Sequence, residues 1–435
     1  MLPGYLIINI TIKELQREVM KVSEPGKKRR GRKRKIEDTD AWMAAELAYI
    51  DMVATNRMPL LRGPIEGEEK IEWLEEIVER CPEYFPALFD LASESIKDGN
   101  DDAGKGYIDR GLQSLREHFS SRDLIDAYYK ICEFLEHYLR FELALEYYNQ
   151  LLVIEKERKK PPVYDRIAHC YASLNDVEKA IEYQRRAIES NPNSKFYSNM
   201  GWLEMIRGNL EEAERALKRA VKLDRRDNIA KKNYEICKTL LKSKKMHNWD
   251  DYLLREVDYD RLDELEEEDE WDEYKKVVVD YNQSRMEAFK RYLMRNPKYS
   301  AAERYDTLFS LWYIFDLVFN AYDDGYFLYD DIGVITDNFK CIMHKFIFKT
   351  GDIDDEIFDG VYNALLEFYK FLRKHKLIER EEYKELKEEM KRLKPELREK
   401  MHRYNEVRHN DDYTEEEKEE IRGELFEGDH EWPTL

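Results

Sequence analysis

The sequence predicts an all-α protein, and three observations support this prediction. The 435 residues include only 17 glycines and 12 prolines, well below the usual shares of about 7% and 5%, so few tight turns are available. Apolar residues recur at three- or four-residue steps, as on one face of a helix. A pattern of small and large apolar residues also repeats with a period of roughly 34 residues, which is typical of stacked helical hairpins. We therefore expect a helical solenoid followed by a second helical domain.

The charge and cysteine content narrow the class of protein further. The 93 acidic and 73 basic residues give a formal net charge of -20, which argues against binding nucleic acid over the whole surface. The five cysteines lack the spacing of a zinc site or the density of a disulfide scaffold. The apolar start, 1–12, lacks the features of a secretory signal, and the apolar stretch 305–319 is too short to span a bilayer. We expect a cytoplasmic protein with reduced thiols and no membrane partner.

The clearest repeat unit begins at Pro161. Two antiparallel helices approach closely only where small residues lie between them, while larger apolar residues fill the flanks and a proline ends the second helix. Gln184 stands where the pattern has an aromatic residue. The other positions follow the pattern, with Tyr164, Ile167, Ala168, Tyr171, Ala180, Ala187 and Pro192.

The same spacing recurs in units that begin at Ser194, Ile125 and Phe85. Upstream, 41–53 and 70–82 are expected to be the helices of a degenerate unit with an insertion between them. Downstream, Asn228 to Lys242 has the polar character of a helix that ends a solenoid. Over about 41–245 the pattern resembles the tetratricopeptide repeat (TPR). The resemblance implies a right-handed solenoid with a protein-binding groove on its concave surface.

The rest of the chain is also expected to be helical but shows no such period. An amphipathic helix follows Gly351 and is capped from Asp354, with apolar residues at Ile357, Val361 and Leu365. We divide the chain into an N-terminal segment with a mobile basic arm (1–40), the solenoid with its capping helix (41–246), a C-terminal helical domain (247–400) and an acidic tail (401–435), loosely held from 413 onward. The first 19 residues are interpreted as a strand, a mis-called start or a contact segment.

The TPR resemblance implies a peptide-binding face along the first helix of each repeat. Aromatic anchors with scattered cations suit a peptide that carries acidic groups. One TPR subtype binds a terminal carboxylate with lysine and asparagine side chains of its first helices, an arrangement called a two-carboxylate clamp. This clamp is not reproduced here, because Asp165 and Ser198 stand where the clamp needs lysine. In the alternative interpretation, Trp202 and the tyrosines pack against neighbouring helices or a folded-back domain. The expected peptide-binding residues are Tyr129, Lys130, Arg166, His169, Asn199, Trp202, Lys232 and Asn233, with Glu133 and His137 on the same face.

A basic arm precedes the repeats. Its centre, Arg30-Gly31-Arg32, is similar to the core of an AT-hook, which lies in the narrow minor groove of A·T-rich DNA. Lys33 departs from that motif, which has proline at this position. The open interpretations are a solubilising tail, a polyanion-binding arm and a nuclear import signal. The candidate nucleic-acid contacts are Lys27, Lys28, Arg29, Arg30, Arg32, Lys33, Arg34 and Lys35.

An opposite run, Asp258 to Glu273, is strongly acidic. It is interpreted as the solvated face of a helix, or alternatively as a partner that masks the basic arm. Catalytic signals are poor: His402, Glu406 and His409 are expected to form a surface stripe, and the Tyr-Asp-Asp triplets at 322 and 329 are expected to serve in turns and caps. We expect no metal and no cofactor.

The sequence therefore predicts a non-catalytic scaffold or adaptor that binds a protein or peptide segment. The alternative is a nucleic-acid-associated adaptor that contacts DNA through the basic arm. An enzyme with its site in 250–400 is the third hypothesis, and convergent carboxylates in a deep pocket there would support it. The sequence indicates neither the oligomeric state nor the partner.

Overall fold

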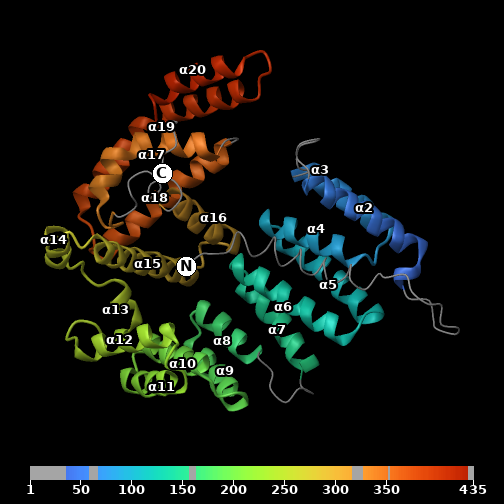
Figure 1. The fold of residues 1–435 in the computed structure, drawn as a ribbon, viewed down its shortest axis with the longest axis horizontal. Coiled ribbons are helices and arrows are strands. Elements are labelled where there is room, and N and C mark those ends of the chain that lie inside the picture. The colour runs from blue at the N-terminus through green and yellow to red at the C-terminus, as the bar shows by residue number, and fades with distance from the viewer. Residues whose placement is uncertain (1–35, 58–66, 156–162, 316–326, 351–352, 430–435) are drawn as a thin grey trace. The chain divides into compact units, whose positions relative to one another are not determined.

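The computed structural model describes residues 36–57, 67–155, 163–315, 327–350 and 353–429. Within these ranges every regular element is a helix and no strand occurs, which confirms the all-α class (Figure 1). The chain divides into two compact units, Met1–Phe196 and Tyr197–Leu435, and the division falls within α10 (Ser194–Arg207). The domain boundary at 246–247 stays a prediction from the sequence.

The first unit is a linear array in which each helix packs against its neighbours in sequence. Packed pairs are α2 with α3, α4 with α5, α6 with α7 and α8 with α9, and α3–α4, α5–α6 and α7–α8 link one pair to the next (Figure 1). This order of contacts is that of a helical solenoid. After the short 3-10 helix Ile36–Asp38, the helices are α2 (Asp40–Arg57), α3 (Gly67–Arg80), α4 (Phe85–Lys97), α5 (Asp101–His118), α6 (Ser121–His137), α7 (Phe141–Glu155), α8 (Val163–Ser173) and α9 (Val177–Ser190).

The small residues of the repeats lie where two helices approach most closely. Ala168 of α8 and Ala180 of α9 are fully buried. At Gly111 of α5 an added Cβ would collide with the ring of Phe89 on α4. These contacts explain why small residues recur at fixed spacing, because a larger side chain would force the helices apart.

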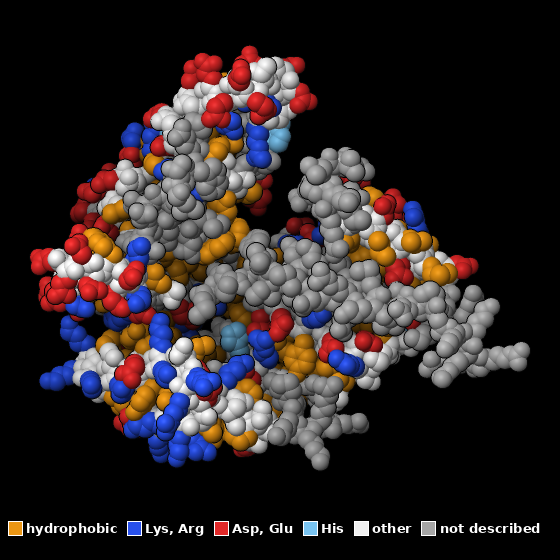
Figure 2. All heavy atoms as spheres, in the orientation of Figure 1, with side chains coloured by type: hydrophobic (Ala, Val, Ile, Leu, Met, Phe, Trp, Pro, Cys, Tyr) orange, Lys and Arg blue, Asp and Glu red, His pale blue; other side chains and the backbone are white. Residues whose placement is uncertain are grey.

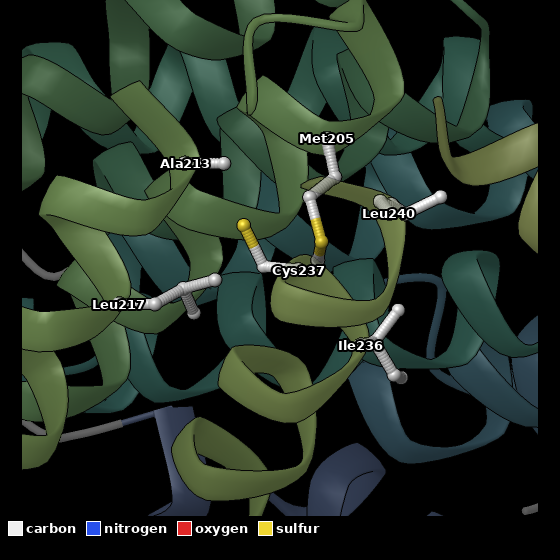
Figure 3. Close-up of a cluster of buried hydrophobic side chains, with 6 residues drawn as sticks. All are labelled: Met205, Ala213, Leu217, Ile236, Cys237 and Leu240. Atoms are coloured by element: carbon white, nitrogen blue, oxygen red, sulfur yellow. The ribbon is translucent and has the colours of Figure 1, made fainter. Parts of the chain in front are cut away.

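The second unit contains most of α10 and all the later helices. The first of these continue the hairpin pattern: α11 packs on α12, which begins at Asn228 and ends at Lys242 as the sequence predicts. Six side chains from α10, α11 and α12 form one buried cluster (Figure 3): Met205, Ala213, Leu217, Ile236, Cys237 and Leu240. The later helices are α11 (Leu210–Leu223), α12 (Asn228–Lys242), α13 (Trp249–Leu253), α14 (Tyr259–Glu267), α15 (Trp271–Arg295), α16 (Ala301–Trp312), α17 (Ile332–Thr350), α18 (Asp355–Lys374), α19 (Arg380–Arg408) and α20 (Glu415–Phe426).

Helices α15 to α19 surround an aromatic core. Phe315 stacks on Tyr329 with ring centroids 4.1 Å apart, and Phe368 of α18 meets Phe289 of α15 edge to face at 5.4 Å. The expected helix after Gly351 is α18, and the Asp354 carboxylate caps it by accepting a hydrogen bond from the Ile357 backbone N–H at 2.8 Å. A capping role for this aspartate is thus what the structure shows.

A fully buried arginine joins three parts of the second unit. The Arg285 guanidinium of α15 donates to both carboxylate oxygens of Asp330, with Nη2 to Oδ2 at 2.6 Å. It also donates to the backbone carbonyls of Leu253 at 2.6 Å and Arg255 at 2.7 Å. Asp330 belongs to the second Tyr-Asp-Asp triplet, so its role is to neutralise a buried cation, beyond the turn and cap roles expected from the sequence. Asp331 does cap α17, because its Oδ1 accepts from the Val334 N–H at 3.3 Å.

The C-terminal stretch differs from the loosely held tail expected from the sequence. Helix α19 continues to Arg408, and Thr414 and Glu417 form a capping box at the start of α20. At the end of α20, Phe426 is fully buried and packs against the rings of Tyr404 and His344. Phe426 and the ion pairs of Glu427 with Lys340 and Lys400 thus hold a helix whose acidic composition alone suggests a solvated tail.

The acidic run Asp258 to Glu273 covers α14 and the first residues of α15. Leu262 and Leu265 point into the protein, whereas the acidic side chains of the run are exposed. This arrangement agrees with a solvated helix face. The basic arm lies outside the described residues, so masking of the arm by this run stays a hypothesis. Within the described ranges, no helix has the length and apolar character needed to cross a bilayer.

Candidate interaction surface

The predicted peptide-binding residues of the first unit lie on α6 and α8, the first helices of two successive repeats. An Arg166 Nη2–H of α8 donates to Glu133 Oε1 of α6, and His169 Nδ1 lies 3.0 Å from Glu136 Oε2. Both pairs join residues 33 positions apart, about one repeat length. The repeat therefore places these four side chains on the same face of consecutive hairpins.

Glu136 is the centre of this polar network. Burial disfavours its charged form, but hydrogen bonds with His169 and Tyr148 and the nearby Arg166 guanidinium outweigh burial, so the pKa of Glu136 lies below its ordinary value. Burial is also the largest influence on Tyr148, and together with the Glu136 charge it raises the pKa of Tyr148 far above the usual range. Glu136 is thus a buried carboxylate that stays ionised because three polar groups surround it.

Tyr129 and Lys130 lie half-buried on α6, about one helical turn before Glu133. The four predicted residues of this unit are therefore on two neighbouring first helices. The sequence did not anticipate that Arg166 and His169 already have carboxylate partners within the array. The repeat spacing could have predicted these pairs, because Glu133 and Glu136 stand 33 residues, about one repeat, before Arg166 and His169.

Asp165, which stands where a carboxylate clamp has lysine, forms hydrogen bonds and an ion pair within the array. Buried Asp165 accepts from Gln184 Nε2 at 3.2 Å and pairs with Lys195 Nζ at 2.9 Å. Gln184 also donates to the backbone carbonyl of Phe196 at 3.0 Å. Asp165, which stands in place of a clamp lysine, and Gln184, which departs from the repeat pattern, thus form one buried hydrogen-bonded pair.

In the second unit, Asn199 and Trp202 lie half-buried on α10, and Lys232 and Asn233 lie on α12. The Asn233 side chain donates to Ser198 Oγ at 3.2 Å. Trp202 packs against the buried cluster of Figure 3. The packing alternative therefore describes the contacts of this tryptophan, and its role in binding a peptide stays a prediction.

Lys232 makes an ion pair with Asp280 of α15, with Nζ 2.7 Å from Oδ1. The same carboxylate accepts from Arg255 Nη2 at 2.6 Å and from the Tyr252 hydroxyl at 3.2 Å. Burial opposes ionisation of Asp280, but these partners outweigh it and hold the pKa of Asp280 below its ordinary value. Lys232 thus helps to join α12 to α15, and peptide binding by Lys232 would have to compete with Asp280.

A cleft of about 1130 Å³ lies in the second unit, between the segment 243–258 and the helices α15 and α18. Its carboxylates are already engaged: Asp250 pairs with Arg291 and Arg295, and Asp258 caps α14. They do not form the convergent set that would support an enzyme.

Two groups of described side chains have metal-ligand distances, with ligand atoms within 4.8 Å of one another. One is Glu136, His169 and Cys170; the other is the exposed set Glu83, Glu117 and His118. In the first group the Glu136 oxygens already face Tyr148, His169 and the Arg166 cation, and burial raises the pKa of the Cys170 thiol well above its ordinary value. These contacts favour a proton-bearing thiol and an internal ion pair over a metal site.

Of the remaining positions singled out from the sequence, some lie within the described residues and some outside them. His402 of α19 lies on the surface, 3.3 Å from Asp355. The arm Lys27 to Lys35 and the first Tyr-Asp-Asp triplet, at Tyr322, lie outside the described residues.

Comparison with known proteins gives a family match and several structural matches. The family described as tetratricopeptide repeat matches residues 161–194 and 194–227. Among solved structures, YrrB, "a TPR protein with an unusual peptide-binding site", shares 14% identity over 45% of this chain and 98% of its own, with a TM-score of 0.31. TTC0263 of Thermus thermophilus, a thermophilic TPR protein, shares 16% over 46% of this chain and 100% of its own, with a TM-score of 0.25. BtubC of P. vanneervenii shares 13% over 63% and 92%, with a TM-score of 0.28.

Proposed function

Residues 161–227 match two tetratricopeptide repeats, and from this premise we propose that the protein is a non-catalytic scaffold. It binds a peptide segment on the face of the array formed by the first helix of each repeat. The observation that carries this proposal is the polar network of Glu133, Glu136, Arg166 and His169 on α6 and α8. It presents a cation and an imidazole, both partly exposed, on a rigid surface of fixed spacing. Repeats of this kind are generally protein-binding surfaces.

An acidic ligand would compete with the internal carboxylates. The Arg166–Glu133 pair is exposed at both ends, and such pairs contribute only about 0–1 kcal/mol. A ligand carboxylate can therefore displace Glu133 from Arg166 at small cost, while Glu136 stays in place beneath. Tyr129 supplies a flat ring beside this position, and Lys130 a further cation.

The test uses the full chain as bait and identifies the captured proteins by mass spectrometry. Arg166→Glu reverses the charge of the central cation, and Arg166→Ala with Trp202→Ala also removes the aromatic anchor. We expect both variants to lose the partners that the parent protein captures. Because Trp202 packs against the buried cluster, the unfolding midpoint of the double variant is measured alongside, and the single Arg166 variant separates binding from stability.

A matched control is available on the second helix of the same repeat. Arg186 of α9 is exposed and paired with Glu182, as Arg166 is with Glu133. Arg186→Glu should leave capture unchanged. Equal capture by the Arg166 and Arg186 variants would refute the binding face.

The alternative, a nucleic-acid-associated adaptor, rests on the eight basic residues between Lys27 and Lys35. Its binding would fall steeply with rising salt, because phosphate contacts release counterions. A gel shift on A·T-rich duplex, with and without this arm, tests it. All five cysteines are free thiols, which supports our further proposal of a cytoplasmic location.

A further inference from the structure

The turn between α11 and α12 carries an unusual concentration of basic side chains for a chain of net charge -20. Five cations occur within 13 residues, and all are exposed. Figure 2 shows Lys and Arg side chains gathered over α11 and α12, whereas acidic side chains predominate over α14 and α20. The five residues, here called the basic turn, are Arg219, Lys222, Arg225, Arg226 and Lys231.

None of these five side chains pairs with a carboxylate among the described residues, although other cations of the same hairpin do. Arg215 pairs with Glu212, Lys218 with Glu214 and Lys238 with Glu235. The two aspartates of the basic turn are used by the backbone instead: Asp224 accepts from the Arg226 N–H, and Asp227 caps α12. With five cations and these two aspartates, the segment 219–231 carries a net charge of +3, and none of its cations is held in an ion pair with a described carboxylate.

Helix stability accounts for only part of this charge: Lys222 lies in the last turn of α11, where the helix dipole favours a cation. Arg225, Arg226 and Lys231 lie at the N-terminal end of α12, where the helix dipole favours acidic side chains and disfavours cations. The first turn of α12 contains no acidic residue. The Asp227 carboxylate at the N-cap offsets part of this unfavourable charge, and an anionic partner would offset the rest.

Two large aliphatic side chains lie among these cations. Ile229 is 65% exposed and Leu223 is 41% exposed. From Lys222 to Ile229, every residue except Asp227 is exposed, so the turn projects into solvent and forms no groove for a peptide. No aromatic side chain that could stack on a nucleic-acid base occurs between Arg219 and Lys231.

We propose that the basic turn binds an anionic membrane surface, with Leu223 and Ile229 entering the interfacial region and the five cations meeting lipid phosphate and carboxylate groups. A projecting turn suits a flat surface, and the combination of aliphatic tips with surrounding Lys and Arg is what an anionic interface attracts. Each cation near such a surface contributes about 1 kcal/mol. The basic turn shares no residue with the α6 and α8 face of the proposed function, and the proposal departs from the expectation that no membrane partner exists.

The test is co-sedimentation of the full chain with vesicles of phosphatidylcholine containing about 30% phosphatidylserine. Arg225→Glu with Arg226→Glu should lower the partition coefficient at least about tenfold, and Ile229→Ser about threefold. Raising the salt should weaken binding, and vesicles of phosphatidylcholine alone should bind little. Because all three substituted side chains are exposed, the fold should be retained, and circular dichroism checks this.

The matched control is the exposed arginine pair of α9, Arg185→Glu with Arg186→Glu, which makes the same charge change elsewhere. The control should bind like the parent protein. Equal loss in both double variants would overturn the proposal in favour of a general charge effect. Unchanged binding by Arg225→Glu with Arg226→Glu would also overturn it, and would assign the binding to another basic segment such as the arm. Duplex DNA is added as a competitor. If DNA binds the same residues at a lower concentration than the vesicles do, the membrane proposal is overturned in favour of nucleic-acid binding.

Discussion

Helices α4 to α9 of the first unit are 11 to 18 residues long, whereas α15, α18 and α19 of the second unit have 25, 20 and 29 residues. The short helices are joined by polar pairs about one repeat apart, such as Glu133 with Arg166. The long helices enclose an aromatic core, and buried Arg285 joins three separate segments. In the first unit each helix thus packs mainly on its neighbours in sequence, whereas in the second unit Arg285 joins segments that lie far apart in the chain.

This difference has a consequence for stability. In a solenoid each repeat contacts only its neighbours, so the effect of a substitution is local and depends on one helix crossing. At Arg285 one side chain satisfies a buried carboxylate and two backbone carbonyls, so its loss is felt by several elements together. Three substitutions test this contrast, in order of decreasing effect.

Arg285→Ala should cause the largest loss, about 3–5 kcal/mol in the free energy of unfolding, because Asp330 stays buried without a counter-charge. Arg285→Leu with Asp330→Leu should recover part of that loss, since no buried charge remains. Urea denaturation followed by circular dichroism measures both. The control is Arg261→Ala, whose exposed pair with Glu264 should contribute less than about 0.5 kcal/mol. If Arg285→Ala changes the free energy of unfolding no more than the control does, the stability of the second unit does not depend on the contacts of Arg285.

Gly111→Ala should destabilise the first unit by about 1–3 kcal/mol, because the new methyl group would collide with the ring of Phe89 and force α4 from α5. Gly106→Ala is the matched control in the same helix, since nothing lies within 4 Å of its added Cβ. This control should stabilise α5 by about 0.5–1 kcal/mol. Thermal unfolding of the two variants gives shifts of opposite sign if close helix approach sets the repeat. Shifts of the same sign would contradict that account.

Removing the Glu136 network should have a smaller, pH-dependent effect. The pKa of Glu136 is lowered in the folded protein because its polar partners outweigh burial, so its charge stabilises the fold above the ordinary pKa of about 4.5 and loses that effect as the pH falls through the folded value. We expect Glu136→Gln to cost about 1.5 kcal/mol at pH 7 and progressively less below about pH 4.5. Urea denaturation from about pH 3.5 to 7 measures this difference. A constant difference over this range would show that the Glu136 charge does not stabilise the array.

Much of the first unit could be predicted from residue spacing. The positions of Ala168, Ala180 and Ala187 indicated two helices in close contact. Helices α4, α8 and α10 begin within two residues of the expected positions, as does α12 in the second unit. A repeat encodes its fold locally, because each hairpin packs only on its neighbours and the same side chains recur. The acidic tail was harder to predict, because tertiary contacts hold α20: Phe426 meets Tyr404 and His344, and Glu427 pairs with Lys340 and Lys400.

The sequence by itself determined the helical class, the repeat period and the bounds of α12, since these follow from local periodicity and helix end signals. Only the tertiary structure decided the partners of the polar side chains. Arg166 has a partner because α6 and α8 lie side by side, and Arg285 has one because Asp330, 45 residues away, returns to α15. Hydrogen bonds and ion pairs depend on distances of a few ångströms between residues far apart in sequence, and periodicity does not specify those distances.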